Sequence, residues 1–97
     1  GGDIVPTWGV PVEEIQKGIK FGVRKVNVDT DLRMAMTGAI RKVLIENAGE
    51  FDPRKYLAPG VAAMEVVCSD RYIQFGAAGH ASAITPRPLS DMMKNYH

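Results

Sequence analysis

The chain has 97 residues, of which 45% are hydrophobic and 24% charged, with a formal net charge of +1. This composition is typical of a globular domain or of a piece of one, and it argues against disorder and low complexity. Twelve Lys and Arg residues lie scattered among eleven acids, so we expect no nucleic-acid surface, and no apolar run is long enough for a membrane span or secretory signal.

Cysteine and histidine usage limits the chemistry further. The single Cys68 excludes an internal disulfide, so a reducing cytoplasm is the expected compartment. Cys68, His80 and His97 do not have the spacing of a closed zinc site. If the protein uses a metal ion, we expect its ligands outside this sequence.

The first expected element is a helix over residues 12–21. Residues 1–11 are rich in Gly and Pro and indicate a loop. The helix follows because its apolar positions share one face, and Gly22 is placed to end it. Those apolar positions are Val12, Ile15 and Ile19.

Residues 23–29 alternate and predict a strand, with valines on one side and polar residues on the other. The polar side carries Lys25, Asn27 and Asp29. The following residues, Asp29 to Asp31, can cap a helix over 32–46, whose apolar positions then recur at helical spacing. They are Leu32, Met36, Ala39, Ile40 and Val43. The pattern is α/β, and a strand-to-helix corner of this kind is where such proteins bind anions.

Two interpretations of Asn27 and Asp29 remain open at this point. They are either solvated residues of a half-buried edge strand or part of a site at the carboxyl end of a strand. Carboxylates at 29 and 31 repel an anion, so backbone N–H groups and Thr30 would hold it, and Asp29 would suit a hydroxyl or a cation. A lone strand cannot satisfy its own backbone, so the sheet comes from elsewhere or the strand prediction is wrong.

The second half of the chain is expected to be helical. Asp52 and Pro53 resemble a cap and a first-turn proline, and Pro59-Gly60 should interrupt or restart that helix. A core-facing stripe follows, and a short helix is expected over residues 89–96 after a flexible exit at 76–80. The stripe consists of Val61, Met64, Cys68, Tyr72 and Phe75.

Arg33 and Arg54 each lie in the first turn of an expected helix, where a cation opposes the helix dipole by about 0.3 to 1 kcal/mol. One interpretation is a nearby carboxylate partner, Asp29 or Asp31 for Arg33 and Asp52 or Glu50 for Arg54. The other is a functional site, where such misfits are more common.

Three motifs together resemble the class II, metal-dependent fructose-bisphosphate aldolases. They are Gly1-Gly2-Asp3-Ile4 with Trp8 before Gly9-Val10-Pro11, Asn27-Val28-Asp29-Thr30-Asp31-Leu32-Arg33, and Glu50-Phe51-Asp52-Pro53-Arg54-Lys55-Tyr56. The resemblance covers essentially the whole chain and corresponds to the carboxyl-terminal third of such an enzyme. It implies that the chain is a fragment of a protein of roughly 300 residues with a (β/α)8 TIM barrel.

The resemblance also implies a division of the chain into two parts. Residues 1–49 would end the barrel, with 23–29 as its eighth strand and 32–46 as its eighth helix, and Lys25, Asn27 and Asp29 would face the barrel interior. Residues 50–97 would form a helical extension that makes dimer or tetramer contacts.

The site residues implied by the resemblance bind substrate. Asn27, Val28, Asp29 and Thr30 would contact dihydroxyacetone phosphate. Arg54 would bind the phosphate of the glyceraldehyde 3-phosphate half, and Arg33 matches a position that in some members reaches that phosphate across the subunit interface. The family's zinc ligands and acid/base carboxylate precede the residue that is Gly1 here, so we expect no catalytic residue and no metal ligand in this chain.

The implied function is zinc-dependent, reversible cleavage of fructose 1,6-bisphosphate, or of a related ketose bisphosphate, in glycolysis, gluconeogenesis or the Calvin cycle. Zinc is the expected cofactor of the parent enzyme, with a monovalent cation as a further candidate. The alternative is a stand-alone helical interaction module without catalysis.

Overall fold

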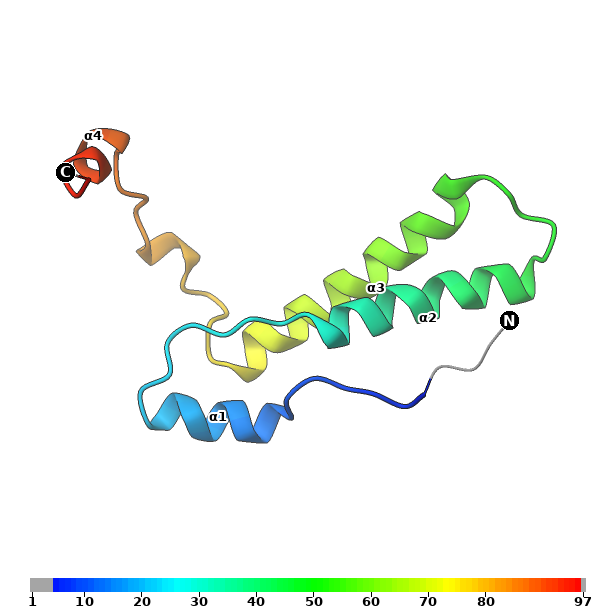
Figure 1. Ribbon diagram of the computed structural model, residues 1–97, viewed down its shortest axis with the longest axis horizontal. Helices are drawn as coiled ribbons and strands as arrows, with labels where there is room; N and C mark the ends of the chain where they lie inside the picture. Colours follow the sequence, from blue (N-terminus) through cyan, green and yellow to red (C-terminus); the bar gives the residue numbers. More distant parts are fainter. Residues whose placement is uncertain (1–4, 97) are drawn as a thin grey trace.

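The computed structural model describes residues 5–96, which form four α-helices and one short 3₁₀ helix (Figure 1). The helices are α1 (Val12–Lys20), α2 (Thr30–Glu46), α3 (Pro53–Gln74) and α4 (Leu89–Met93), with η1 (Ala81–Ala83) between the last two. The motif residues Gly1 to Ile4, and His97, lie outside the described residues.

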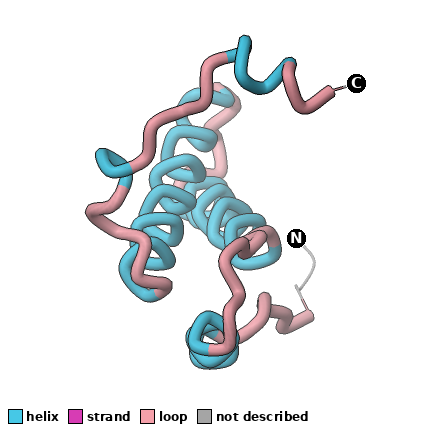
Figure 2. The backbone as a smooth tube through the Cα atoms, turned by 90° about the vertical axis from the view of Figure 1, so that its left-hand side faces the viewer, coloured by secondary structure: helices cyan, strands magenta, loops and turns pink. Residues whose placement is uncertain are grey.

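An antiparallel hairpin of α2 and α3 forms the body of the molecule (Figures 1 and 2). The apolar face predicted for α2 is confirmed, because all of its members are half-buried: Leu32, Met36, Ala39, Ile40 and Val43. The stripe predicted for α3 is confirmed only in part, because Met64, Cys68 and Phe75 are half-buried whereas Val61 and Tyr72 are exposed.

Gly60 is the buried residue of α3 and lies against α2. A Cβ at this position would lie 3.0 Å from Met36 Cγ and 3.3 Å from Ile40 Cγ1, so only glycine allows the two helices to approach so closely. The predicted interruption at Pro59-Gly60 is wrong, since α3 runs through both residues. Pro59 removes one backbone donor from the helix, and packing against α2 offsets that loss.

Helix α1 lies beside the end of α3, where Gln16 Nε2 donates a hydrogen bond of 2.9 Å to the Gln74 carbonyl (Figure 1). The expected helix over 12–21 is confirmed, and it ends one residue earlier than expected, at Lys20. Gly22 follows with a φ of 111°, a backbone conformation that favours glycine.

The strand expected over residues 23–29 is not present in the described part of the chain, and this segment is an extended loop (Figure 2). A strand is defined by hydrogen bonds to a neighbouring strand, and residues 5–96 provide none. The predicted alternation nevertheless persists, because Val26 and Val28 are half-buried while Lys25, Asn27 and Asp29 are exposed. Lys25 Nζ donates to Asn27 Oδ1 on the polar side, as expected for residues i and i+2 of an extended chain.

Residues 77–96 leave the hairpin as an arm that carries η1 and α4 (Figure 1). The expected final helix is present but shorter, at Leu89–Met93. The radius of gyration is 18.4 Å, whereas a compact domain of about 100 residues has roughly 13 Å. No hydrophobic side chain among the described residues is fully buried, and large ones such as Phe21 and Phe51 are more than 80% exposed. The described residues therefore do not enclose a core of their own.

Candidate functional site

The predicted substrate segment leads directly into α2. Asn27 and Val28 belong to the extended loop, Asp29 is the residue before the helix, and Thr30 is its first residue. The helix thus begins two residues earlier than expected. No side chain caps its first turn, so α2 has unsatisfied backbone N–H groups at the end of the loop. This is the kind of helix start at which anions bind in other proteins.

Arg33 pairs with Asp29, at 2.8 Å between Nε and Oδ1. Of the two carboxylates considered from the sequence, Asp29 is therefore the partner. Both side chains are mostly exposed, at 79% and 66%, and they lie four residues apart on one helical turn. Exposed pairs of this kind contribute at most about 1 kcal/mol, so either side chain can exchange its partner for a ligand at little cost.

Arg54 pairs with Asp52 at the start of α3. Its Nε and Nη2 both donate to the carboxylate, with Nη2 to Oδ2 at 2.8 Å. Asp52 also caps the helix by accepting the Arg54 backbone N–H at 3.0 Å, which confirms the predicted cap. The guanidinium lowers the pKa of Asp52, and the carboxylate in turn raises the pKa of Arg54. The Arg54 side chain is 90% exposed. The contact with Asp52 fixes its position, while the guanidinium remains accessible from solvent.

The structure does not bring Arg54 together with residues 27–30. Arg54 is the second residue of α3, which begins beside the far end of α2, whereas Thr30 is the first residue of α2 (Figure 1). The 17 residues of α2 span about 25 Å at 1.5 Å per residue. This separation is longer than an extended six-carbon sugar with two phosphates. Residues 27–30 and Arg54 of one chain therefore cannot contact one such molecule in this arrangement.

Asp31 is the best-connected acidic residue of the motif, and sequence reasoning assigned it only as a cap or a partner of Arg33. Its Oδ1 accepts the Gly9 N–H at 2.9 Å, and its Oδ2 lies 3.3 Å from Arg71 Nη2 in the last turn of α3. Arg71 Nη1 also contacts Asp70 at 2.5 Å. An acidic residue in the first turn of one helix and an arginine in the last turn of the next could have predicted this ion pair. The prediction would require knowing that the two helices are antiparallel.

The Gly9 hydrogen bond lowers the pKa of the Asp31 carboxyl, partial burial offsets some of that effect, and the Arg71 guanidinium lowers the pKa further. The side chains of Asp31 and Arg71 are only 23% and 22% exposed. Asp31 is thus a charged, partly buried group whose two oxygens both have partners.

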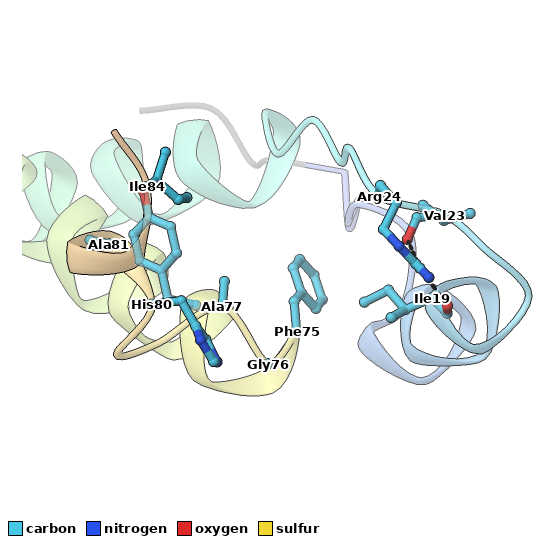
Figure 3. Close-up of a pocket in the computed structure, with 10 residues that line it drawn as sticks. Ile19, Val23, Arg24, Phe75, Gly76, Ala77, His80, Ala81 and Ile84 are labelled. Carbon is cyan, nitrogen blue, oxygen red and sulfur yellow. Dashed lines mark hydrogen bonds between the residues drawn. The ribbon is translucent and has the colours of Figure 1, made fainter. Parts of the chain in front are cut away.

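A largely apolar cavity of about 460 Å³ lies between the ends of α1 and α3 (Figure 3). Arg24 lines it and donates from Nη1 to the carbonyl oxygens of Ile19 and Val23, at 3.1 and 3.0 Å. The guanidinium therefore caps the end of α1. His80 lines the opposite side, and none of the predicted substrate residues lines the cavity.

Across residues 5–96, no three His, Cys, Asp or Glu side chains gather into a group that could hold a metal ion. The sequence resemblance implies zinc ligands outside this chain, so the described residues are not the ones expected to hold that ion. Within the same range, no helix is both long enough and apolar enough to cross a membrane.

Comparison with known proteins adds a family assignment to this geometry. The family model described as fructose-bisphosphate aldolase class-II matches residues 7–80. Fructose-bisphosphate aldolases of Stutzerimonas stutzeri and Pseudomonas aeruginosa are 62% and 59% identical over 96 residues, which is 99% of this chain and 27% of each relative. The sequence called fructose-bisphosphate aldolase 2 of Rhodobacter capsulatus is 56% identical, and the match covers 84% of it. The chain thus spans about a quarter of the length of the first two relatives.

Proposed function

This chain belongs to the class II fructose-bisphosphate aldolase family, and from that premise we propose that it is the carboxyl-terminal part of an enzyme that reversibly cleaves fructose 1,6-bisphosphate. The observation that carries the proposal is the family match over residues 7–80, because it includes every predicted substrate residue. The products would be dihydroxyacetone phosphate and glyceraldehyde 3-phosphate. A cytoplasmic location and a role in central carbohydrate metabolism belong to the same proposal.

The start of α2 supports binding of a phosphate. Its first N–H groups have no side-chain cap, and the helix dipole is positive at that end. The carboxylates at 29 and 31 would repel an anion if they were unpaired, but each pairs with a cation, Arg33 and Arg71 respectively. Pairing removes most of the repulsion, so Thr30 and the neighbouring backbone amides are suited to the phosphate of dihydroxyacetone phosphate.

The neighbouring polar side chains suit the hydroxyl and carbonyl oxygens of the sugar. Asn27 offers both an amide donor and an acceptor, and Asp29 offers a carboxylate that accepts from a hydroxyl. Both side chains are exposed on the same side of the loop, next to the start of α2. Val28 lies between them with its side chain on the other side, so it would contribute through its backbone.

Arg54 is proposed to bind the second phosphate from another copy of the chain. It is too far from residues 27–30 within one chain, and its exposed, fork-shaped guanidinium suits a phosphate. A dimer or larger assembly would follow from this geometry. The exposed apolar side chains and the lack of an enclosed core also support extensive packing against further protein.

We further propose a (β/α)8 barrel for the parent enzyme, with residues 1–49 at its end and 50–97 as an extension. In such a barrel, neighbouring strands would supply the hydrogen bonds that residues 23–29 lack here. A zinc ion would polarise the substrate carbonyl and would be bound by residues outside this chain. A monovalent cation would be a second ligand of the parent enzyme.

A chimera tests the proposed function. The matching segment of the Stutzerimonas stutzeri aldolase is replaced by this chain, and cleavage of fructose 1,6-bisphosphate is followed by reduction of the triose phosphate products with NADH. The chimera should retain most of the activity, whereas the relative without the segment should have none. A folded chimera without turnover would contradict the proposal and favour a helical interaction module.

A further inference from the structure

We propose that Asp31 and Arg71 are positioning residues, which fix the substrate segment 27–30 without touching the substrate. The inference rests on the proposed function and adds to it a division of roles between the two carboxylates of one motif. Asp29 would contact the substrate, whereas Asp31 would contact only other residues of the protein.

Asp31 joins three segments that are far apart in the sequence. Gly9 lies in the loop before α1, 22 residues earlier, and Arg71 lies at the end of α3, 40 residues later. Because the two contacts use different oxygens of the carboxylate, they fix its orientation as well as its position. A Cβ at position 9 would lie 3.0 Å from Asp31 Oδ2, so the loop approaches as closely as a glycine allows.

In the proposed barrel, strand partners would restrain residues 23–29, whereas Thr30 already belongs to α2. The start of α2 is the point where the segment is attached to the helical hairpin. Asp31 is the second residue of that helix, directly after Thr30. A restraint on Asp31 therefore limits the movement of Thr30 and Asp29, which carry the proposed contacts.

The Asp29–Arg33 pair has the opposite properties. It is local, spans one turn, and both side chains are mostly exposed, whereas the Asp31 and Arg71 side chains are about three quarters covered. Exposed pairs rearrange at little cost, while removing one partner of a covered pair leaves an uncompensated charge. This contrast assigns ligand binding to Asp29 and positioning to Asp31.

Arg71 should also affect phosphate binding, in a direction that can be tested. It neutralises Asp31 next to the helix start proposed for phosphate. Without Arg71, the unpaired Asp31 carboxylate would repel the phosphate and weaken binding. Changing Asp31 to Asn as well would remove that charge, so the double variant should bind better than the Arg71 variant alone.

The test uses the active chimera with Arg71→Met, Arg71→Lys, Asp31→Asn and the double variant Asp31→Asn/Arg71→Met. Arg71→Met should raise KM for fructose 1,6-bisphosphate about tenfold, as expected for loss of one partner of a partly buried charge pair, with a smaller change in kcat. The double variant and Arg71→Lys should each recover much of that loss. The matched control is Asp70→Asn, because Asp70 contacts the same guanidinium away from Asp31, and its kinetics should equal those of the parent chimera.

A second measurement needs no activity. In the chimera, amide hydrogen exchange at Gly9 should become faster in Asp31→Ala, which removes the acceptor oxygen, and stay unchanged in Asp70→Asn. If the chimera is inactive but this exchange pattern is found, the proposed function fails and the attachment stands. If the chimera is active and Arg71→Met behaves like Asp70→Asn, or if the double variant is no better than Arg71→Met, the positioning role is wrong.

Discussion

The guanidinium of Arg71, in the last turn of α3, lies 3.3 Å from the Asp31 carboxylate in the first turn of α2. Each charge lies at the helix end where the dipole stabilises it, the anion at an N-terminus and the cation at a C-terminus. The antiparallel hairpin is what brings these two ends together, so the pair depends on the α2–α3 packing that it also stabilises.

The contacts of Asp31 with the Gly9 N–H and with Arg71 should make the stability of the fold depend on pH in the acid range. The folded-state pKa of Asp31 is below its ordinary value of 3.8, so its contribution is complete above that value and is lost as the pH falls through the folded pKa. The free energy of unfolding of the chimera should therefore exceed that of its Asp31→Asn variant at pH 7, and the difference should shrink towards pH 3. Urea unfolding at several pH values measures it. A difference that does not change with pH would show that the Asp31 charge contributes nothing.

Gly60→Ala should destabilise the helical hairpin. Alanine favours the helix by about 1 kcal/mol, but its Cβ would overlap Met36 and Ile40, and overpacking costs about 1 to 3 kcal/mol. The nearest atoms, Met36 Cγ and Ile40 Cγ1, lie close to the backbone of α2 and cannot move away easily. We therefore expect a net loss of stability. Gly38→Ala is the matched control, because it gives the same helical gain in α2 with no atom within 4 Å. Thermal unfolding of the chimera should show a lower Tm for the first variant and a higher Tm for the second. A raised Tm in both would mean that α2 can move away from α3.

Arg54→Ala should impair the use of bisphosphates by the active chimera. Loss of a fork-shaped contact to phosphate should lower kcat/KM for fructose 1,6-bisphosphate by roughly 30- to 1000-fold, with Arg54→Lys recovering only part. Fructose 1-phosphate lacks the second phosphate and should be nearly insensitive to the change. Equal losses for both substrates would make Arg54 a structural residue that serves mainly to pair with Asp52.

The separation of Arg54 from residues 27–30 predicts complementation between copies. Chimeras carrying Asn27→Ala and Arg54→Ala should each be impaired. In a two-fold dimer formed after unfolding and refolding them together, about a quarter of the sites would contain neither change. Activity should therefore rise above that of either variant refolded alone. If it does not, Arg54 acts within its own chain or not at the substrate.

The 97-residue chain without a partner should neither bind zinc at a defined stoichiometry nor cleave fructose 1,6-bisphosphate. The reason is chemical, because the described residues provide no cluster of metal ligands and the resemblance locates the acid/base carboxylate outside this chain. Titration calorimetry with zinc and the coupled NADH assay measure both properties. Tight binding of one zinc ion per chain would mean that this chain does contain zinc ligands.

Several features follow from the sequence alone because their causes act within a few residues. The apolar spacing of 12–21 and Gly22 define α1, and Asp52 with Pro53 defines the start of α3. The half-buried face of α2 follows from a period of 3.6 residues. The motifs around Asn27 and Arg54 also indicate the family, which the family match over residues 7–80 confirms, because a motif is defined by residue type and spacing alone.

Other features depend on contacts between distant segments and were decided by the tertiary structure. Residues 23–29 have the alternation of a strand, but a strand needs a partner, and none lies within the described chain. Pro59 and Gly60 locally favour a helix break, yet packing against Met36 and Ile40 keeps α3 continuous. The partners of Asp31 lie 22 and 40 residues away, so no local pattern distinguishes it from Asp29. The start of α2 and the end of α3 meet only in the tertiary structure. There Asp31 is held by Gly9 and Arg71, while Asp29 stays exposed beside Arg33.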